Sequence, residues 1–432
     1  MKASICVFVI VMFFIPVTAI QRVSSEIEVD EWHHIQTASN DDYIDERQEV
    51  SDSSGPLPPP DVGKDVDISV LTNQVVIDGV PAYKWHHGCG PTSVGMIIGY
   101  LDEHGYPNLV PGSAKYQTDA VDEMIASSEN YKDYCLPIDT PDNILPDKSE
   151  PPVGDEHKDN CVADFMYTSQ SYHDLAYGAT YPSDTGKGLE GYITWKYPNV
   201  YVITRNRYGF DRITWDIYCR EIDANRPVVL SVDTDGSGRA NHFVLGIGYD
   251  DEGAHRYYAC YNTWNTNIHW YEWNKVEAGK KWGVYGGTYY FLTYKPNKPL
   301  ILSGPSSGKI NVLLNFSAKT SDPDGDQLYY LWDWGDNTTS DWLGPYDSGE
   351  EMTASHSWSD EGIYEIKVKV KDVNDAESEW SNPFMISVSK IYTLREFRFE
   401  EIPNWLKQIF SENMLTRIIQ FLTPLIVPHH LS

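Results

Sequence analysis

Apolar residues recur at helical spacing just after Cys89, and this pattern predicts the first helix of the chain. They occupy positions i, i+3, i+4 and i+7, namely Val94, Ile97, Ile98 and Leu101. Gly105 ends the pattern, as glycine commonly does at a helix C-terminus. A second, shorter helix is predicted after Thr214, a residue type that caps helix N-termini well. Its apolar face carries Trp215, Tyr218 and Ile222.

Strand patterns follow the second helix. The runs "VVLSVD", "HFVLGIGY" and "RYYACYNTW" are rich in β-branched and aromatic residues, and the turn "DDEGA" separates the last two. A helix followed by antiparallel strands predicts an α+β domain, which we expect to span residues 66–295. Residues 106–190 are polar, rich in Pro and Tyr and weakly periodic, so we expect an insertion there without predicting its fold.

A different pattern begins after the Pro- and Gly-rich segment "KPNKPLILSGPSSGK". The run "YEIKVKVKD" alternates with period two, and Gly and Asp turns separate the apolar runs around it. This pattern predicts a small all-β sandwich over residues 297–389. Residues 390–432 form an amphipathic tail, whose apolar stripe is interrupted by Arg417, Gln420 and Pro424 and is not expected to span a membrane.

The N-terminal segment has the pattern of a secretory signal. A basic start is followed by an apolar run and by small residues at Val17 and Ala19, which predicts cleavage after Ala19. An uncleaved membrane anchor is the alternative. Residues 20–65 are acidic and end in "SGPLPPPDVG", so they are interpreted as a linker or pro-segment. The predicted location is therefore secreted or at the cell surface.

The net charge of the chain restricts the kinds of molecule that it is expected to bind. The chain has 432 residues, with 63 acidic and 33 basic side chains and a formal net charge of -30. Such a surface repels phosphate backbones, so nucleic acid is not an expected partner. Removal of the signal leaves an odd number of cysteines, which indicates one thiol outside any disulfide framework.

Cys89 has the best context for that thiol. It stands at the predicted helix start, where unpaired backbone N–H groups and the helix dipole lower the pKa of a thiol. Pro91 suits the first helical turn, and Gly90 allows close approach to the sulfur. A disulfide half or a buried thiol is the structural alternative. Zinc binding with His86 and His87 matches no structural zinc spacing.

A thiol nucleophile needs a base and a group that orients the base. His242, at the start of the predicted strand "HFVLGIGY", is the candidate base, with a half-buried structural histidine as the alternative. Asn262 on the next strand is the candidate orienting residue, although an ordinary strand-end turn explains it nearly as well. Asp250 is the fallback.

Several motifs then carry a family resemblance. The segments "VPAYKWHHGCGPTSVGMIIGYL", "DANRPVVLSVD", "NHFVLGIGYD" and "YNTW" together resemble the C39-like peptidases, a branch of the papain-like cysteine peptidases, over about residues 68–294. The resemblance implies a papain-like α+β fold. It also implies that Cys89 is the nucleophile, His242 the general base, and Asn262 the orienting residue where the family more often has Asp.

The same family places a glutamine a few residues before its cysteine as an oxyanion donor, whereas the nearest upstream glutamine here is Gln74. The backbone N–H of Cys89 is then one expected donor, and His86 or His87 is the candidate for a second. The implied chemistry needs no cofactor and no metal ion.

The second domain resembles a polycystic-kidney-disease (PKD) domain, an Ig-like β-sandwich. The matching segments are "DWGD", "HSW" and "GIY" leading to Asp372. The resemblance implies contacts with cell-surface proteins or glycans. In "SDPDGDQ", Asp322, Asp324 and Asp326 offer oxygen ligands for calcium, but the absence of a twelve-residue EF-hand loop favours a plain turn.

The remaining cysteines suggest two disulfides. Cys135 with Cys161 and Cys219 with Cys260 are the expected pairs, and other pairings of the four are equally consistent with the sequence. The sequence as a whole predicts an exported cysteine peptidase that acts on a peptide or protein substrate. A non-catalytic adhesion protein with a degenerate papain-like domain and a thiol acyltransferase are the alternatives.

Overall fold

The computed structural model describes residues 57–58, 62–134, 148–149, 157–173, 175, 178–209, 212–251 and 255–390. The predicted signal, most of the linker, Cys135 and the C-terminal tail lie outside these residues. The chain divides after Tyr294 into two compact units.

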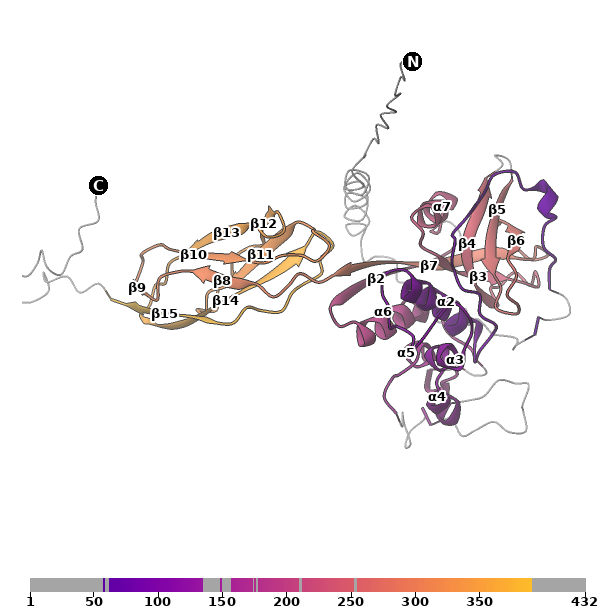
Figure 1. Cartoon of the computed structure of the whole chain (residues 1–432), viewed down its shortest axis with the longest axis horizontal. Helices are drawn as coiled ribbons and strands as arrows, with labels where there is room; N and C mark the ends of the chain where they lie inside the picture. The colour runs from indigo at the N-terminus through magenta and orange to yellow at the C-terminus, as the bar shows by residue number, and fades with distance from the viewer. Residues whose placement is uncertain are drawn as a thin grey trace, which may run out of the picture. The chain divides into compact units, whose positions relative to one another are not determined.

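The first unit contains both predicted helices and several others. The α-helices are α2 (Cys89–Glu103), α3 (Asp119–Ile125), α4 (Ser128–Asp133), α5 (Val162–Phe165), α6 (Thr185–Lys196) and α7 (Trp215–Asp223). The short 3-10 turns are Ile68–Val70, Ser171–His173 and Pro182–Asp184. Figure 1 shows α2 to α6 grouped together, with α7 apart from them. The sequence prediction is thus confirmed for α2 and α7.

One antiparallel sheet accompanies these helices. Its strands are β1 (Gln74–Val76), β2 (Val200–Tyr208), β3 (Val228–Asp233), β4 (His242–Asp251), β5 (Arg256–Tyr261), β6 (His269–Glu272) and β7 (Gly283–Tyr294). The order is β2-β7-β3-β4-β5-β6, and β1 pairs with β4. The strands predicted from "VVLSVD", "HFVLGIGY" and "RYYACY" are therefore β3, β4 and β5.

Helix α2 is the central helix of this unit. It packs on β4 and also contacts α3, α5 and α6. Nearly all of its residues are buried, including Thr92 and Ser93, so it is a core helix rather than an amphipathic surface helix. Gly99 allows this packing, because a Cβ there would collide with the ring of Tyr83. The buried setting fixes where the N-terminus of α2, and hence Cys89, lies.

The insertion for which the sequence predicted no fold contributes α3 to α6. A buried ionic cluster ties it together: His157 Nδ1 lies 2.7 Å from Asp133 Oδ2, and His157 Nε2 lies 3.2 Å from Asp164 Oδ1. Asn130 donates to the same Asp164 oxygen at 2.6 Å. These partners come from α4, α5 and the segment before α5, which explains why local periodicity did not reveal the arrangement.

The second unit is the predicted all-β sandwich. Its strands are β8 (Leu300–Ser303), β9 (Ser307–Lys309), β10 (Leu314–Lys319), β11 (Leu328–Asp333), β12 (Leu343–Tyr346), β13 (Glu351–His356), β14 (Gly362–Asp372) and β15 (Phe384–Ser389). One sheet has the order β13-β10-β8 and the other β12-β11-β14-β15-β9. Its core includes the buried aromatic side chains of Phe316, Trp332, Trp334 and Trp358.

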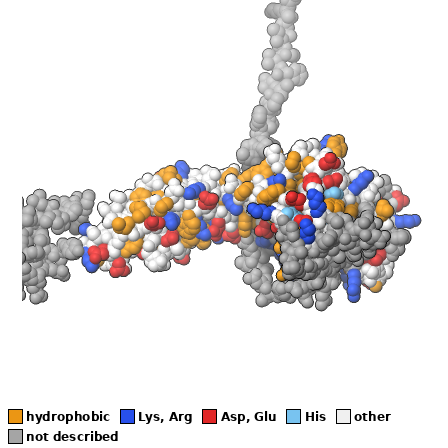
Figure 2. All heavy atoms as spheres, turned by 90° about the horizontal axis from the view of Figure 1, so that it is seen from below, with side chains coloured by type: hydrophobic (Ala, Val, Ile, Leu, Met, Phe, Trp, Pro, Cys, Tyr) orange, Lys and Arg blue, Asp and Glu red, His pale blue; other side chains and the backbone are white. Residues whose placement is uncertain are grey.

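On the face shown in Figure 2, basic side chains are scattered among acidic and hydrophobic ones. The exposed hydrophobic side chains of the second unit include Leu300, Leu313, Ile363 and Met385. Within the described ranges, every helix is too short or too polar to cross a lipid bilayer.

The cap of α7 provides a test of the first unit's local energetics. Thr214 Oγ1 accepts a hydrogen bond from the backbone N–H of Ile217 at 3.2 Å. We expect Thr214→Ala to lower the free energy of unfolding of this unit by about 1 kcal/mol, because an orphan N–H of the first turn loses its acceptor. Urea denaturation followed by tryptophan fluorescence measures the change. The exposed Thr72→Ala is the matched control, and equal losses in both variants would contradict the capping role.

Candidate functional site

Cys89 is the first residue of α2, and the structure places its sulfur beside the start of β4. The backbone N–H of Phe243 donates to Cys89 Sγ at 3.4 Å. Cys89 is only 1% exposed. A helix N-terminus and an N–H donor both stabilise a thiolate relative to a thiol. The sulfur therefore lies next to Phe243, the residue that follows His242. The cysteine motif and the histidine motif are nevertheless far apart in the sequence.

His242 has one ring nitrogen engaged and one available. Its Nε2 lies 2.8 Å from the backbone carbonyl oxygen of Asn262. Because a carbonyl only accepts, Nε2 carries the proton and Nδ1 holds the lone pair. Nδ1 is buried and has no hydrogen-bond partner within the described part of the chain. The preferred tautomer is thus the one in which Nδ1 can accept a proton.

Burial also sets the protonation state of this histidine. It lowers the pKa of His242 to about 4, and the hydrogen bond to the Asn262 carbonyl only partly opposes the shift. The imidazole is therefore neutral above about pH 4, which is the form required of a general base.

Asn262 contacts His242 through its backbone rather than its side chain. The side-chain Oδ1 accepts a hydrogen bond from the backbone N–H of Trp264 at 3.1 Å. Trp264 in turn stacks on the His242 ring, with centroids 4.1 Å apart and planes inclined by 10°. The side chain of Asn262 thus stabilises the turn. The turn in turn positions the Asn262 carbonyl and the Trp264 indole against the ring of His242.

Thr263, between these two residues, adopts a left-handed conformation with φ of 65°. This conformation is unfavourable for a β-branched residue and persists only where the surroundings impose it. Its carbonyl accepts a hydrogen bond from Trp85 N, and its hydroxyl lies 3.5 Å from His242 Nε2. The strained residue therefore links the segment before Cys89 to the turn beside His242.

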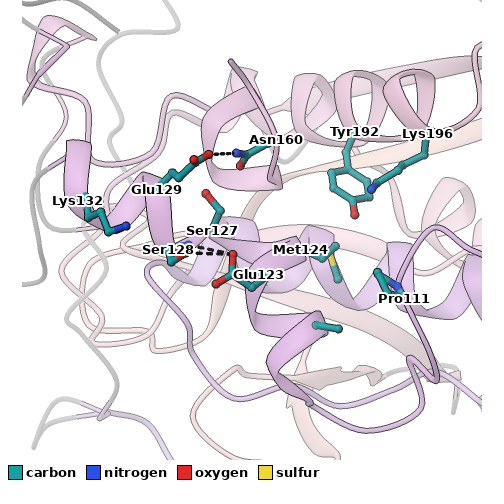
Figure 3. Close-up of a pocket in the computed structure, with 11 residues that line it drawn as sticks. Pro111, Glu123, Met124, Ser127, Ser128, Glu129, Lys132, Asn160, Tyr192 and Lys196 are labelled. Carbon is teal, nitrogen blue, oxygen red and sulfur yellow. Dashed lines mark hydrogen bonds between the residues drawn. The ribbon is translucent and has the colours of Figure 1, made fainter. Parts of the chain in front are cut away.

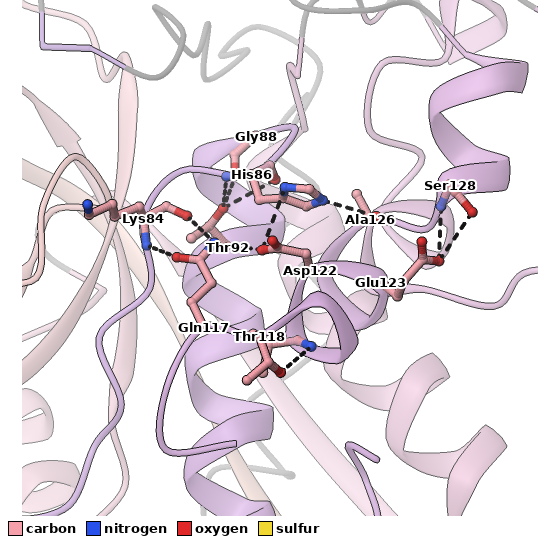
Figure 4. A network of polar contacts seen from close by, with 11 residues as sticks. Lys84, His86, Gly88, Thr92, Gln117, Thr118, Asp122, Glu123, Ala126 and Ser128 are labelled. Carbon is pink, nitrogen blue, oxygen red and sulfur yellow. Dashed lines mark hydrogen bonds and ion pairs between the residues drawn. The ribbon is translucent and has the colours of Figure 1, made fainter. Parts of the chain in front are cut away.

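The two oxyanion candidates upstream of Cys89 face α3 and α4. The backbone N–H of His86 donates to Thr92 Oγ1 at 3.0 Å, and its Nε2 lies 3.2 Å from the carbonyl oxygen of Ala126 (Figure 4). The His87 ring is fully buried and packs against Tyr131, with centroids 4.4 Å apart and planes inclined by 55°.

A glutamine does approach this segment, but from later in the sequence. Gln117 Oε1 accepts from the backbone N–H of Lys84 at 2.7 Å, and its Nε2 donates to the carbonyl of Lys84 and to Asp122 (Figure 4). Its amide group is thereby engaged with α3 and with the segment before Cys89. None of these hydrogen bonds directs the Gln117 amide group toward the sulfur of Cys89.

Asp250, the fallback orienting residue, lies eight residues further along β4 than His242. At strand spacing the separation is roughly 26 Å. Its Oδ2 accepts from the backbone N–H of Asn73 at 2.6 Å. Asp250 therefore stabilises the strand β1 end of the sheet, and the fallback assignment is wrong.

The expected disulfide between Cys219 and Cys260 is also wrong, because both are free thiols. Cys219 lies on α7, and Cys260 is buried on β5. Cys161 is a free thiol as well, and its expected partner Cys135 lies outside the described residues.

The pocket in Figure 3 lies elsewhere in the first unit. It opens between α3, α4 and α6, and both acidic and basic side chains line it. Its lining includes Glu123, Glu129, Lys132 and Lys196. None of the residues that line it is a candidate for the thiol chemistry.

The arrangement brings the Cys89 thiol next to the residue that follows His242. Sequence reasoning proposed Cys89, His242 and Asn262 for the site, but it did not foresee the contacts of the Phe243 amide, Thr263 and Trp264. The tryptophan was visible in "NTW". The contributions of the Phe243 amide and of Thr263 come from backbone geometry, which the residue type does not predict.

Two family models match the chain in the order that the sequence indicated. Residues 77–290 match the Peptidase_C39 like family, and residues 298–388 match the PKD domain. No curated protein matches the chain.

Solved structures resemble the second unit. The PKD domain of an M14-like peptidase from a Thermoplasmatales archaeon is 39% identical and covers 23% of this chain and 99% of its own, with a TM-score of 0.22. The PKD domain of a human VPS10 domain-containing receptor is 16% identical and covers 23% of this chain and 77% of its own, with a TM-score of 0.17. By these matches, the chain contains a Peptidase_C39-like domain at residues 77–290, followed by a PKD domain at residues 298–388.

Proposed function

We propose that this protein is an exported cysteine peptidase that hydrolyses peptide bonds with Cys89 as nucleophile and His242 as general base. The family match supports a peptidase. The observation that carries the catalytic assignment is the contact between Cys89 Sγ and the amide of Phe243, since it holds the sulfur next to the residue that follows His242. The Nδ1 of His242 has no hydrogen-bond partner among the described residues.

The first half of the reaction transfers the acyl group to sulfur. His242 Nδ1 takes the proton of the Cys89 thiol, and the thiolate attacks the peptide carbonyl carbon, so that a C–S bond forms. The negative charge that develops on the carbonyl oxygen is stabilised by the backbone N–H of Cys89. The C–N bond then breaks as the imidazolium returns its proton to the leaving amine.

The second half releases the acyl group. His242 takes a proton from a water molecule, and the hydroxide attacks the thioester carbonyl. The C–S bond breaks, the carboxylic acid leaves, and Cys89 regains its proton from the imidazolium. Both reacting residues are about 1% exposed, so a peptide reaches the sulfur only after a neighbouring segment has moved.

The PKD domain supports an extracellular setting and contacts with other proteins. It contributes no residue to the thiol chemistry, so we assign it to binding at a cell surface rather than to hydrolysis. The net charge of -30 also suits a protein that stays soluble outside the cell.

The nucleophile is tested by comparing two thiols. We expect Cys89→Ala to lower kcat/KM on a peptide library by more than about 10⁴-fold, because the attacking group is lost. Cys219→Ala is the matched control, since burial raises the pKa of Cys219 to about 12 and makes it a poor nucleophile. Mass spectrometry of iodoacetamide labelling reports which thiol reacts.

The same assay separates the alternatives. Labelling of Cys89 no faster than free cysteine, with activity unchanged in Cys89→Ala, would leave a non-catalytic adhesion protein. Formation of an amide product when an amine is added during turnover would instead identify an acyltransferase.

The orienting contact through the Asn262 carbonyl generates a second prediction. Asn262→Ala keeps the carbonyl that accepts from His242 and loses the side-chain contacts with the Trp264 amide and with Tyr271. We expect kcat/KM to fall by about 10-fold, since only the turn is loosened. Asn267→Ala, in an exposed position of the same loop, is the control. A loss of about 10⁴-fold, as when an orienting carboxylate is removed from a serine peptidase triad, would show that the side chain itself orients the base.

The pH profile follows from the pKa of His242, which burial lowers to about 4. We expect the acid limb of kcat/KM to lie near pH 4 rather than near the ordinary value of 6.5. Between these values the unfolded chain binds a proton that the folded chain does not, so stability decreases as the pH falls through this window. Circular dichroism at each pH separates unfolding from titration. An acid limb centred at or above pH 6.5 would contradict a buried neutral base.

A further inference from the structure

The loop between β10 and β11 gathers acidic side chains in the PKD domain. Asp322, Asp324 and Asp326 each offer a carboxylate oxygen, and these oxygens all lie within 4.8 Å of one another. Asp322 organises the loop, because its Oδ1 accepts from the backbone N–H groups of Asp324 at 2.8 Å and Asp326 at 3.3 Å. Like charges at this spacing repel one another unless a cation or protons lie between them.

A separate observation points to a missing ligand. Asp322 is 6% exposed, and its Oδ2 is buried without a hydrogen-bond partner in the described structure. A buried carboxylate oxygen without a partner is costly, and buried polar atoms are almost always satisfied. The oxygen belongs to the side chain around which the loop is folded, so it is held in place rather than free to turn to solvent.

A neighbouring strand borders the acidic loop. Asp372, the last residue of β14, is 1% exposed and pairs in register with Leu328, two residues beyond Asp326. Asn374, just after Asp372, donates to Asp326 Oδ2 at 3.0 Å. The turn after β14 is therefore tied to the acidic loop through Asn374.

We propose that Asp322, Asp324 and Asp326 form a calcium-binding site in the PKD domain. The ligands are all hard oxygen donors, which select calcium over the softer metals that cysteine and histidine bind. Three carboxylates within one short loop suit the adaptable geometry of calcium better than the strict octahedron of magnesium. This proposal replaces the plain turn that the sequence favoured, and it is independent of the thiol chemistry.

Calorimetric titration of the EDTA-treated full chain with calcium chloride tests the site directly. We expect one calcium ion to bind per chain, with a Kd on the order of 10⁻⁴ M, as in other extracellular modules. The ion should raise the unfolding midpoint of the PKD domain by roughly 5–10 °C at saturation, because it binds only the folded loop. No heat and no shift at about 10 mM calcium would overturn the proposal.

Variants identify the ligands. Asp322→Asn keeps the Oδ1 acceptor and replaces the orphan oxygen by an NH₂ group, so we expect the calcium affinity to fall at least about 10-fold while the domain still folds. Asp326→Asn should weaken binding similarly and serves if the first variant does not fold. Asp341→Asn, at an exposed position, makes the same charge change and should bind as the parent does. If all three variants weakened calcium binding equally, or if magnesium chloride or sodium chloride raised the unfolding midpoint as much as calcium chloride, the effect would be charge screening and not binding at a specific site.

Discussion

The packing of the N-terminus of α2 on the first residues of β4 is the constraint on which the proposed thiol site depends. It places the sulfur of Cys89 3.4 Å from the amide nitrogen of Phe243, and it does so because α2 is buried along almost its whole length. A core helix cannot slide without opening cavities, so its first residue is positioned as firmly as its middle. Hydrophobic packing of α2 thereby fixes the position of the Cys89 thiol, and the Phe243 amide adds a polar contact to it.

In this site a backbone carbonyl orients the histidine, a role that a side-chain carboxylate has in the serine peptidase triad. The carbonyl of Asn262 selects the tautomer of His242, and the strained Thr263 turns that carbonyl into position. The consequence for sequence tolerance is direct, because a backbone acceptor survives substitution of its own side chain as long as the turn persists. The asparagine that the family resemblance singles out therefore matters through the conformation of its loop.

One unsatisfied buried polar atom supports each of the two proposals. Among the described residues of the first unit, Nδ1 of His242 is buried without a hydrogen-bond partner. Among those of the second unit, Oδ2 of Asp322 is buried without a partner in a cluster of carboxylates. Each exception carries a cost in stability that folding alone does not explain. A proton in the first case and a cation in the second would supply the missing partner.

The sequence by itself determined the two-domain plan, the helix after Cys89, the strand at His242 and the β-sandwich, because periodicity and capping are local properties. It also indicated Cys89 and His242 as the candidates for thiol chemistry. It did not determine the helical insertion, whose buried polar contacts join separate segments, or that Cys219 and Cys260 are free thiols. Only the tertiary structure decided that Asp250 lies at the far end of β4, that the Asn262 carbonyl contacts His242, and that Asn374 contacts the acidic loop. Those relations depend on strand register and burial, which arise when distant parts of the chain pack together.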